Sequence, residues 1–353
     1  MKVLSLFSGV GGFDYGLENA GMQTVFQCEI DKHCTKILER HWPNVPRWQD
    51  VQTLTGDYVL SKAEQVDVVA WGSPCQDLSI AGKRAGLAGA NSNLFYEGIR
   101  IIKEMRQASG GQYPSISIWE NVMGALNSNK GADFGRVIDE MAEAGALVIE
   151  WRCLDAKYFG VPQRRRRVFV VAIFDPAIAR DCRDPILPIS KSVCWHSKTS
   201  KEEQGEFAKR TSSGINSNRA IIESKFVGPL AASDHKFPQQ QQVRENKCVV
   251  ESLLLDSFRV NDVRVYQSPV QTLRKNMGNG GNNVPQLFEP KMAVRRLTPV
   301  ECERLMGWPD NWTEGQTDGH RYRQCGNGVA SPVAEWIGEQ IMNIRASDEP
   351  TQQ

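Results

Sequence analysis

The sequence predicts an α/β protein whose mostly parallel sheet is covered by helices on both faces and is followed by a second, irregular domain. In the first half, short apolar runs alternate with helical stretches, as in sheets whose parallel strands are buried on both sides. Glycine or polar residues follow most of these runs, at the strand ends where α/β sheets bind ligands. After about Asp175 the composition shifts to Pro, Ser, Asn and Gln with little helical periodicity.

The individual elements are predicted from apolar runs and the residues that bound them. Strands are expected at 3–7, 24–28, 66–71, 115–119, 146–153 and 168–174, and helices at 13–20, 32–40, 93–106, 134–144, 298–306 and 331–344. Asp31 suits the N-cap of the second helix, and Thr298 caps a helix that has Pro299 at its first position. In the irregular segment only short strand-like pieces are expected, such as residues 264–266.

Composition limits the class of protein. The chain of 353 residues has 41% hydrophobic residues, 24% charged residues and a net charge of +1, which indicates a soluble globular protein of about two domains. A nucleic-acid surface would therefore be a local basic patch. The nine cysteines form no C-x-x-C pair, so a metal site is not expected. No segment is typical of a secretion signal or a membrane helix, which predicts reduced thiols and a cytoplasmic location without membrane contact.

A glycine-rich turn follows the first strand. Gly9, Gly11 and Gly12 would let the backbone approach a ligand at a helix N-terminus, although, taken alone, they are better explained by a tight structural turn. Glu29 ends the second strand, where a carboxylate can hold both ribose hydroxyls of a nucleoside cofactor. Asp50, near the end of a third strand, is either an adenine contact or a loop aspartate.

Three further strand ends carry residues suited to chemistry. Ser73-Pro74-Cys75-Gln76 places a thiol after an apolar strand, where it is either a nucleophile or an inert small hydrophobe. Glu120 follows the apolar run 116–119, where it either caps the next element or, with its pKa raised by burial, holds a proton. The arginine run 164–167 is either a solvated face or, through Arg167, a contact to a carbonyl or phosphate.

The order of these motifs resembles the DNA (cytosine-5)-methyltransferase family of bacteria and phages. Residues 295–310 and Gly326-Asn327-Gly328-Val329 extend the resemblance, which covers about residues 1–175 and 290–345. It implies a Rossmann-like class I methyltransferase sheet that depends on S-adenosylmethionine, with a smaller, irregular target recognition domain. The cofactor-binding catalytic domain is expected at 1–185 plus 322–353. The recognition domain and hinge are expected at 186–321, including the motif at 295–312.

The resemblance also implies roles for the residues at the strand ends. Cys75 would add to carbon 6 of a cytosine, Glu120 would contact N3 and the exocyclic amine, and Arg167 would contact O2. Arg165 would support the same region. The family often has Glu where this chain has Arg166, which leaves the division of roles between Arg165 and Arg167 open.

By the same resemblance S-adenosylmethionine is the cofactor and S-adenosylhomocysteine the product, and no metal takes part. Its expected contacts are Phe7, Gly9, Gly11, Gly12, Glu29, Ile30, Asp50, Pro74, Leu94, Asn327 and Val329. Ile30 stands where an aromatic residue is common, so weaker stacking on adenine is expected. The substrate would be duplex DNA with its target base flipped out. The expected DNA contacts are Gln76, Ser79, Lys83, Arg84, Gln163 and Thr272. The protein would be a monomer, and a cognate restriction endonuclease would act separately.

Three alternatives compete with this interpretation. A tRNA cytosine-5 methyltransferase would share the fold and chemistry, although the long variable segment favours DNA. A non-catalytic DNA-binding homologue would have lost the thiol, the glutamate or the glycine turn, and all three are present. A nicotinamide dehydrogenase would need the full G-x-G-x-x-G turn, which this sequence lacks.

Overall fold

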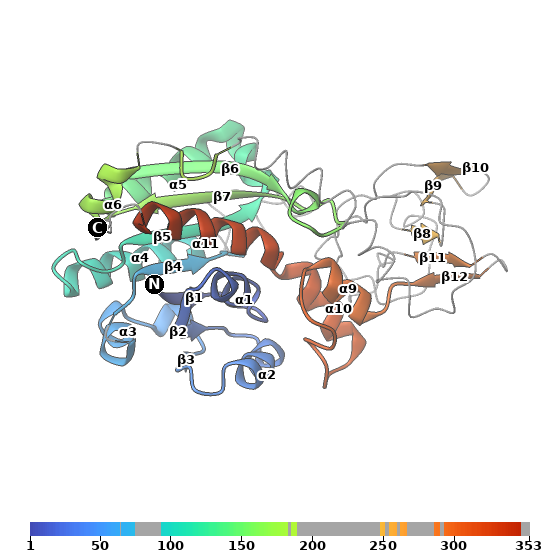
Figure 1. The fold of residues 1–353 in the computed structure, drawn as a ribbon, viewed down its shortest axis with the longest axis horizontal. Helices are drawn as coiled ribbons and strands as arrows, with labels where there is room; N and C mark the ends of the chain where they lie inside the picture. The colour runs from blue at the N-terminus through green and yellow to red at the C-terminus, as the bar shows by residue number, and fades with distance from the viewer. Residues whose placement is uncertain are drawn as a thin grey trace, which may run out of the picture. The chain divides into compact units, whose positions relative to one another are not determined.

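The structure is a computed structural model that describes residues 1–63, 65–74, 93–182, 185–188, 248–250, 254–259, 262–266, 286–289 and 293–346 (Figure 1). The chain forms two compact units. One comprises 1–154, 166–188 and 334–353, and the other comprises 155–165 and 189–333. The predicted catalytic domain instead includes 155–165 and 322–333, which lie in the second unit. The division into catalytic and recognition domains stays a prediction.

The first unit contains a seven-stranded sheet with the strand order β3-β2-β1-β4-β5-β7-β6 (Figure 1). The strands are β1 Lys2–Leu6, β2 Gln23–Cys28, β3 Arg47–Trp48, β4 Val68–Trp71, β5 Ile116–Val122, β6 Val148–Asp155 and β7 Arg166–Ile173. The pairs β1–β2, β1–β4, β2–β3 and β4–β5 are parallel, whereas β5 and β7 are antiparallel. The predicted α/β fold with a mostly parallel sheet is confirmed. The strand order reverses between β1 and β4, which is where such sheets bind ligands.

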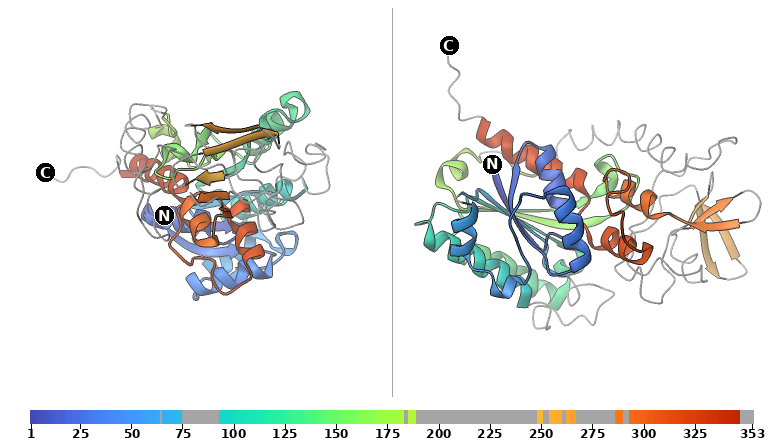
Figure 2. Two further views of the ribbon diagram at one scale, coloured as in Figure 1. Left: turned by 90° about the vertical axis from the view of Figure 1, so that its right-hand side faces the viewer. Right: turned by 90° about the horizontal axis from the view of Figure 1, so that it is seen from below.

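Helices cover both faces of this sheet (Figure 2). Among the described residues the helices are α1 Gly12–Asn19, α2 Lys32–His41, α3 Gly56–Ala63, α4 Asn93–Ala108, α5 Ala132–Glu143, α6 Pro176–Asp181, α9 Pro299–Leu305, α10 Asp318–Asn327 and α11 Ser331–Ala346. Short 3₁₀ turns lie at η1 Val51–Thr53, η3 Met123–Leu126, η4 Ser128–Gly131 and η5 Ala156–Tyr158. Helices α3, α6 and α10 were not predicted; all three are short, with six to ten residues.

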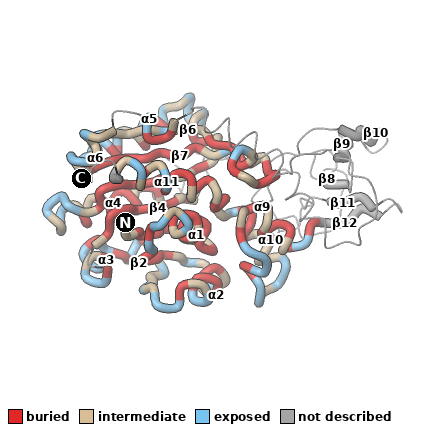
Figure 3. The backbone as a smooth tube through the Cα atoms, in the orientation of Figure 1, coloured by how far each residue is buried: buried red, intermediate tan, exposed pale blue. Residues whose placement is uncertain are grey.

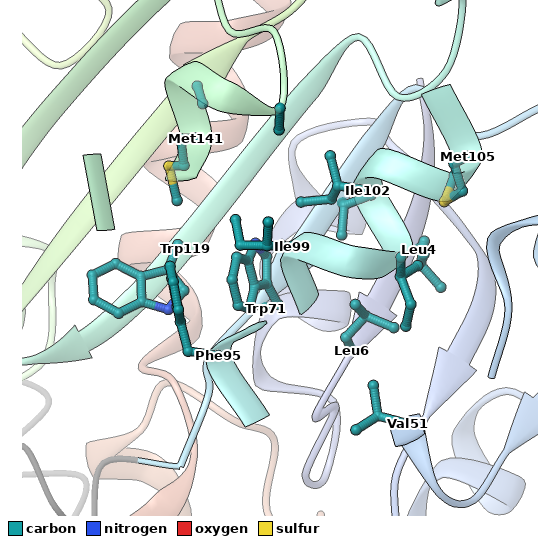
Figure 4. Close-up of a cluster of buried hydrophobic side chains, with 14 of the residues drawn as sticks. Leu4, Leu6, Val51, Trp71, Phe95, Ile99, Ile102, Met105, Trp119 and Met141 are labelled. Atoms are coloured by element: carbon teal, nitrogen blue, oxygen red, sulfur yellow. The ribbon is translucent and has the colours of Figure 1, made fainter. Parts of the chain in front are cut away.

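The core on one face is formed by alternate residues of the central strands packed against α3, α4 and α5 (Figure 4). Trp71 lies in this cluster, where its ring stacks on Phe95 at 5.5 Å between centroids. Its indole Nε1 donates to Ser117 Oγ at 2.9 Å, so the one polar atom of the ring is satisfied. Gly98 of α4 lies against this ring, because a Cβ at Gly98 would be 2.4 Å from it. The strands β1 and β4 are therefore buried on both faces (Figure 3).

The other face is covered by α1 and by the part of α11 from Ala334 onward. Phe13 of α1 meets Phe169 of β7 edge to face at 6.4 Å. Gly338 of α11 lies against α1, because a Cβ there would be 2.7 Å from that of Ala20. The last helix thus completes the layer over the first strand–helix unit.

Asp14 is a fully buried carboxyl group within this face. Ser5 Oγ donates to it at 2.9 Å, and Gln27 Nε2 donates at 2.8 Å. Arg47 Nε in turn donates to Gln27 Oε1 at 2.9 Å. Burial raises the pKa of Asp14 to about 6, although both hydrogen bonds oppose that rise.

The second unit contains a five-stranded sheet with the order β10-β9-β8-β11-β12. Its strands are β8 Cys248–Val250, β9 Leu254–Arg259, β10 Asp262–Tyr266, β11 Gln286–Glu289 and β12 Ala293–Arg296. The sequence indicates only isolated strand-like pieces here. Helix α9 begins with the capping box of Thr298 and Glu301, which confirms the predicted N-cap.

Among the described residues, no helix has both the length and the hydropathy that a membrane span requires.

We predict that Gly98→Ala destabilises the protein. Alanine at an exposed helical position gains about 0.5–1 kcal/mol over glycine, but the added methyl group would overlap the Trp71 ring. Overpacking of this kind costs about 1–3 kcal/mol, so the free energy of unfolding in urea should fall. Gly135→Ala is the matched control, because Gly135 is an exposed helical glycine with no atom within 4 Å of a Cβ. Stabilisation by both substitutions would contradict the packing argument.

A second prediction concerns Asp14. Its folded-state pKa of about 6 exceeds the ordinary value of 3.8, so the folded state binds the proton more tightly than the unfolded state does. The protonated Asp14 therefore contributes its full stabilisation of the folded state below pH 3.8, and this contribution is lost as the pH rises through about 6. Relative to wild type, Asp14→Asn should gain up to about 3 kcal/mol in unfolding free energy between about pH 4 and pH 7. The exposed Asp139→Asn is the control, and an equal pH effect in both variants would rule out burial as the cause.

Candidate active site

One edge of the seven-stranded sheet gathers the predicted residues of the first unit. Because β1, β2, β4 and β5 are parallel, their carboxyl ends meet at that edge. Antiparallel β7 begins there, with Arg167 in register with Val122. The glycine turn, Glu29, Pro74, Glu120 and Arg167 therefore come from different strands to one region.

The turn between β1 and α1 depends on glycine at Gly11. Gly11 is the N-cap of α1 with φ 85°, a left-handed conformation that glycine adopts without strain. A Cβ there would also lie 2.4 Å from the ring of Trp42. Phe7 has φ 55°, and its partly buried side chain packs against the core. The turn thus leaves backbone, rather than side chain, at the start of α1.

Glu29 is tied to this turn by both carboxylate oxygens. Oε2 accepts from the Gly9 N–H at 2.7 Å, and Oε1 accepts from the Asp31 N–H at 2.8 Å. Burial raises the pKa of Glu29 in spite of these two donors. Each oxygen retains a lone pair that can accept from a ligand hydroxyl.

The neighbours of Glu29 give the same region an apolar wall and a second carboxylate. Ile30 is 69% exposed, although it follows a buried strand. Asp50 caps η1 by accepting from the Gln52 N–H at 3.0 Å. Asp31 caps α2, which confirms the predicted N-cap. Leu94, near the start of α4, is partly buried against the core.

Ser73, which precedes the Pro-Cys-Gln tripeptide, is held by residues of β5. Trp119 Nε1 donates to Ser73 Oγ at 3.2 Å, and Asn121 Nδ2 donates to Ser73 O at 3.3 Å. Asn121 is 1% exposed. It was not among the predicted site residues, although an amide in a buried strand is itself a signal of a specific hydrogen bond. Pro74, half-buried, therefore leaves the sheet from a fixed point.

Glu120 and Arg167 form an ion pair at this edge. Arg167 Nε lies 3.1 Å from Glu120 Oε1, and each side chain is 12% exposed. A Cβ on Gly72 would be 3.3 Å from Glu120 Oε2, so the absence of a side chain there leaves room for the carboxylate. The pair presents an acceptor and a cation side by side. Such a pair can bind a group that offers a donor next to an acceptor.

The remaining described residues lie in the second unit. Gln163 is fully buried, and its amide donates to Leu305 O at 2.7 Å. Its predicted DNA contact stays a prediction. Arg165 is 3% exposed and donates to the Gly326 and Gly328 carbonyls. Asn327 is exposed, whereas Val329 is buried.

Several predicted residues lie outside the described part of the chain, namely Cys75, Gln76, Ser79, Lys83, Arg84 and Thr272. Within the described ranges, no group of three or more His, Cys, Asp or Glu side chains is placed to hold a metal ion.

Known proteins share this fold. The S. pombe Dnmt2 methyltransferase aligns with a TM-score of 0.63 at 18% identity, covering 97% of this chain and 98% of its own. The Entamoeba histolytica methyltransferase EhMeth aligns with a TM-score of 0.59 at 13% identity, covering 97% and 98%. At these identities the likeness shows the fold alone, and that fold is the predicted class I methyltransferase sheet.

Relatives in sequence extend over almost the whole chain. Type II methyltransferase M.Bsp6I of Bacillus sp. (strain RFL6) is 29% identical over 350 residues, 97% of this chain and 98% of that protein. Type II methyltransferase M.HpaII of Haemophilus parainfluenzae is 27% identical over 345 residues, 96% and 88% of the two chains. The family profile described as C-5 cytosine-specific DNA methylase matches residues 1–343. The chain therefore belongs to the C-5 cytosine-specific DNA methylase family.

Proposed function

We propose that this protein transfers a methyl group to C5 of a flipped-out cytosine in a short duplex DNA sequence, through a covalent bond from Cys75 to C6. The observation that carries the proposal is the Glu120–Arg167 pair. It stands at the sheet edge from which the Ser73-Pro74 backbone leads to Cys75. A cytosine ring offers N3 and the exocyclic amine on one edge and O2 beside them, which matches a carboxylate next to a guanidinium.

The cofactor that fits the turn between β1 and α1 is S-adenosylmethionine. It supplies an electrophilic methyl group and leaves as S-adenosylhomocysteine. Glu29, already oriented by the Gly9 and Asp31 amides, would accept both ribose hydroxyls. Ile30 offers an exposed apolar wall to adenine, and Asp50 would accept from the adenine amine. Phe7, Gly9, Gly11, Gly12, Pro74 and Leu94 would line the site, with Asn327 and Val329 at the methionine end.

The chemistry requires a nucleophile, because C5 of cytosine is itself unreactive. The Cys75 thiolate would add to C6, and the electron pair released from the C5–C6 double bond would make C5 nucleophilic toward the methyl group that the cofactor would supply. Glu120 would donate a proton to N3 and accept a hydrogen bond from the amine, and Arg167 would donate to O2, so the negative charge that builds on the ring is stabilised. Loss of the C5 proton and elimination of the thiolate restore the ring. Water or hydroxide would accept that proton.

The target base is reached by flipping, since C6 lies inside the stacked duplex. Gln76, Ser79, Lys83, Arg84 and Thr272 remain the proposed DNA contacts. Gln163, whose DNA contact is likewise proposed, holds the arginine segment against Leu305. Monomeric action in a bacterial cytoplasm beside a separate restriction endonuclease remains a prediction.

The proposal is tested by incubation of the protein with labelled S-adenosylmethionine and a mixed library of duplex DNA, followed by mapping of methylated cytosines. DNA that carries 5-fluorocytosine at the mapped position should then form a covalent adduct at Cys75. Fluorine blocks the last elimination because it cannot leave as a proton does.

Two controls sharpen this test. Cys75→Ser should abolish both methylation and the adduct, whereas Cys153→Ser, a change at a described cysteine outside the proposed site, should retain both. Transfer RNA is tested as a substrate in a parallel incubation with labelled S-adenosylmethionine. Methylation of RNA alone would favour the RNA-directed alternative, and an adduct at another cysteine would contradict the mechanism.

Cofactor affinity should depend on Glu29. Glu29→Gln removes the charge and one acceptor while keeping the shape, and a hydrogen bond to a charged group contributes about 1.5–3 kcal/mol. The Kd for S-adenosylhomocysteine, measured by calorimetry, should rise about 10- to 100-fold. Because burial raises the pKa of Glu29, wild-type affinity should weaken as pH falls through that raised value. Glu39→Gln, on the exposed side of α2, is the control. Equal Kd values for Glu29→Gln and Glu39→Gln would show that Glu29 does not bind the cofactor.

A further inference from the structure

We infer that Arg165 is a positioning residue that holds the Gly326-Asn327-Gly328 turn, and that it does not contact the target base. This inference rests on the proposed function, in which Asn327 and Val329 form the methionine end of the cofactor site. The two arginines then have different roles, because Arg167 is paired with Glu120 and Arg165 is directed to a backbone turn.

The Arg165 side chain reaches the turn through two hydrogen bonds. Its Nη2 donates to Gly326 O at 3.2 Å and to Gly328 O at 2.5 Å, and these carbonyls flank Asn327. The residue is 3% exposed, whereas its neighbour Arg166 is exposed. A side chain buried to this degree is committed to its protein partners.

The backbone of Arg165 is fixed as well. Its N–H donates to Asp155 Oδ1 at 3.0 Å, and its carbonyl accepts from the Ala156 N–H at 3.1 Å. Gln163, two residues earlier, is held to Leu305 O. The guanidinium therefore projects from a segment that is anchored on both sides.

The C-terminus of α10, where the turn begins, is a favourable place for a positive charge. Helix α10 ends at Asn327, and the last carbonyls of a helix lack partners within it. A positive charge at a helix C-terminus is favourable, yet α10 has no basic residue in its last turn. Arg165 supplies that charge from outside the helix.

Gly328 completes the arrangement. A Cβ on Gly328 would lie 2.7 Å from the ring of Trp308, and Trp308 Nε1 donates to Ser331 Oγ at 2.9 Å. Arg165 thus bonds to the carbonyls of the turn, and the Trp308 ring packs against Gly328. Asn327 is exposed between these two held neighbours.

The test compares Arg165→Lys and Arg165→Ala with Arg167→Lys. Binding of S-adenosylhomocysteine is measured by calorimetry, and kcat and the cofactor KM are measured on the mapped DNA. Loss of positioning should raise the cofactor Kd and KM about tenfold or more in the Arg165 variants, with a much smaller change in kcat at saturating cofactor. Arg167→Lys should show the reverse, a large loss of kcat at nearly constant cofactor Kd. The exposed Arg180→Ala is the control for loss of charge and should match wild type.

A second variant covers the case in which the Arg165 variants do not fold. Asn327→Ala, at an exposed position, should reproduce the rise in cofactor Kd. Where Arg165→Ala does fold, adding Asn327→Ala should raise the Kd by less than the two separate effects combined. A fall in kcat with unchanged cofactor Kd in Arg165→Lys, or an unchanged Kd in Asn327→Ala, would overturn the inference. Absence of methylation by the wild-type protein would count against the proposed function, while the calorimetric arm would still test the positioning role.

Discussion

Strand direction is the constraint on which the proposed site depends. Parallel β1, β2, β4 and β5 end at one edge of the sheet, and antiparallel β7 begins there. Strands advance about 3.3 Å per residue, so a parallel β7 would start beside Ile116 and place Arg167 roughly 13 Å along the strands from Glu120. The single reversed strand therefore makes the ion pair at 3.1 Å geometrically available. Near this edge Trp71 of β4 stacks on Phe95 of α4 in the buried core.

Close packing extends this rigidity into the loops. Gly11 fits against Trp42, and Gly72 leaves space for the Glu120 carboxylate. Glu29 accepts from two loop amides, which joins the end of the second strand to the turn after the first strand. Buried polar groups of this kind stabilise a site only when their partners are present. For Glu29, burial raises the pKa of the carboxyl group, while its two amide donors fix the position of that group.

The second unit uses buried charge for a similar purpose. Glu303 is fully buried, and it pairs with Arg321 at 2.9 Å and accepts from the Thr313 N–H. Burying such groups costs desolvation energy that hydrogen bonds must offset. Together with Gln163 and Arg165, this pairing ties α9, α10 and the turn after α10 into one polar framework. The motifs that contain Gln163, Arg165 and the turn after α10 therefore stabilise the fold of the second unit in addition to their proposed part in the site.

Local sequence patterns alone establish the α/β class, most helix and strand positions, and the order of motifs that is typical of the family. Apolar periodicity and residue types at strand ends are properties of short stretches of chain, so they can be read without knowledge of long-range contacts. Long-range packing instead settles that Gln163 and Arg165 face inward, that Asn121 holds Ser73, and that Arg167 pairs with Glu120. Neighbouring arginines look alike in sequence, because which of them is buried depends on partners more than a hundred residues away. The five-stranded sheet of the second unit was missed for the same reason, since its strands of three to six residues are too short to show a pattern of their own and are stabilised by pairing.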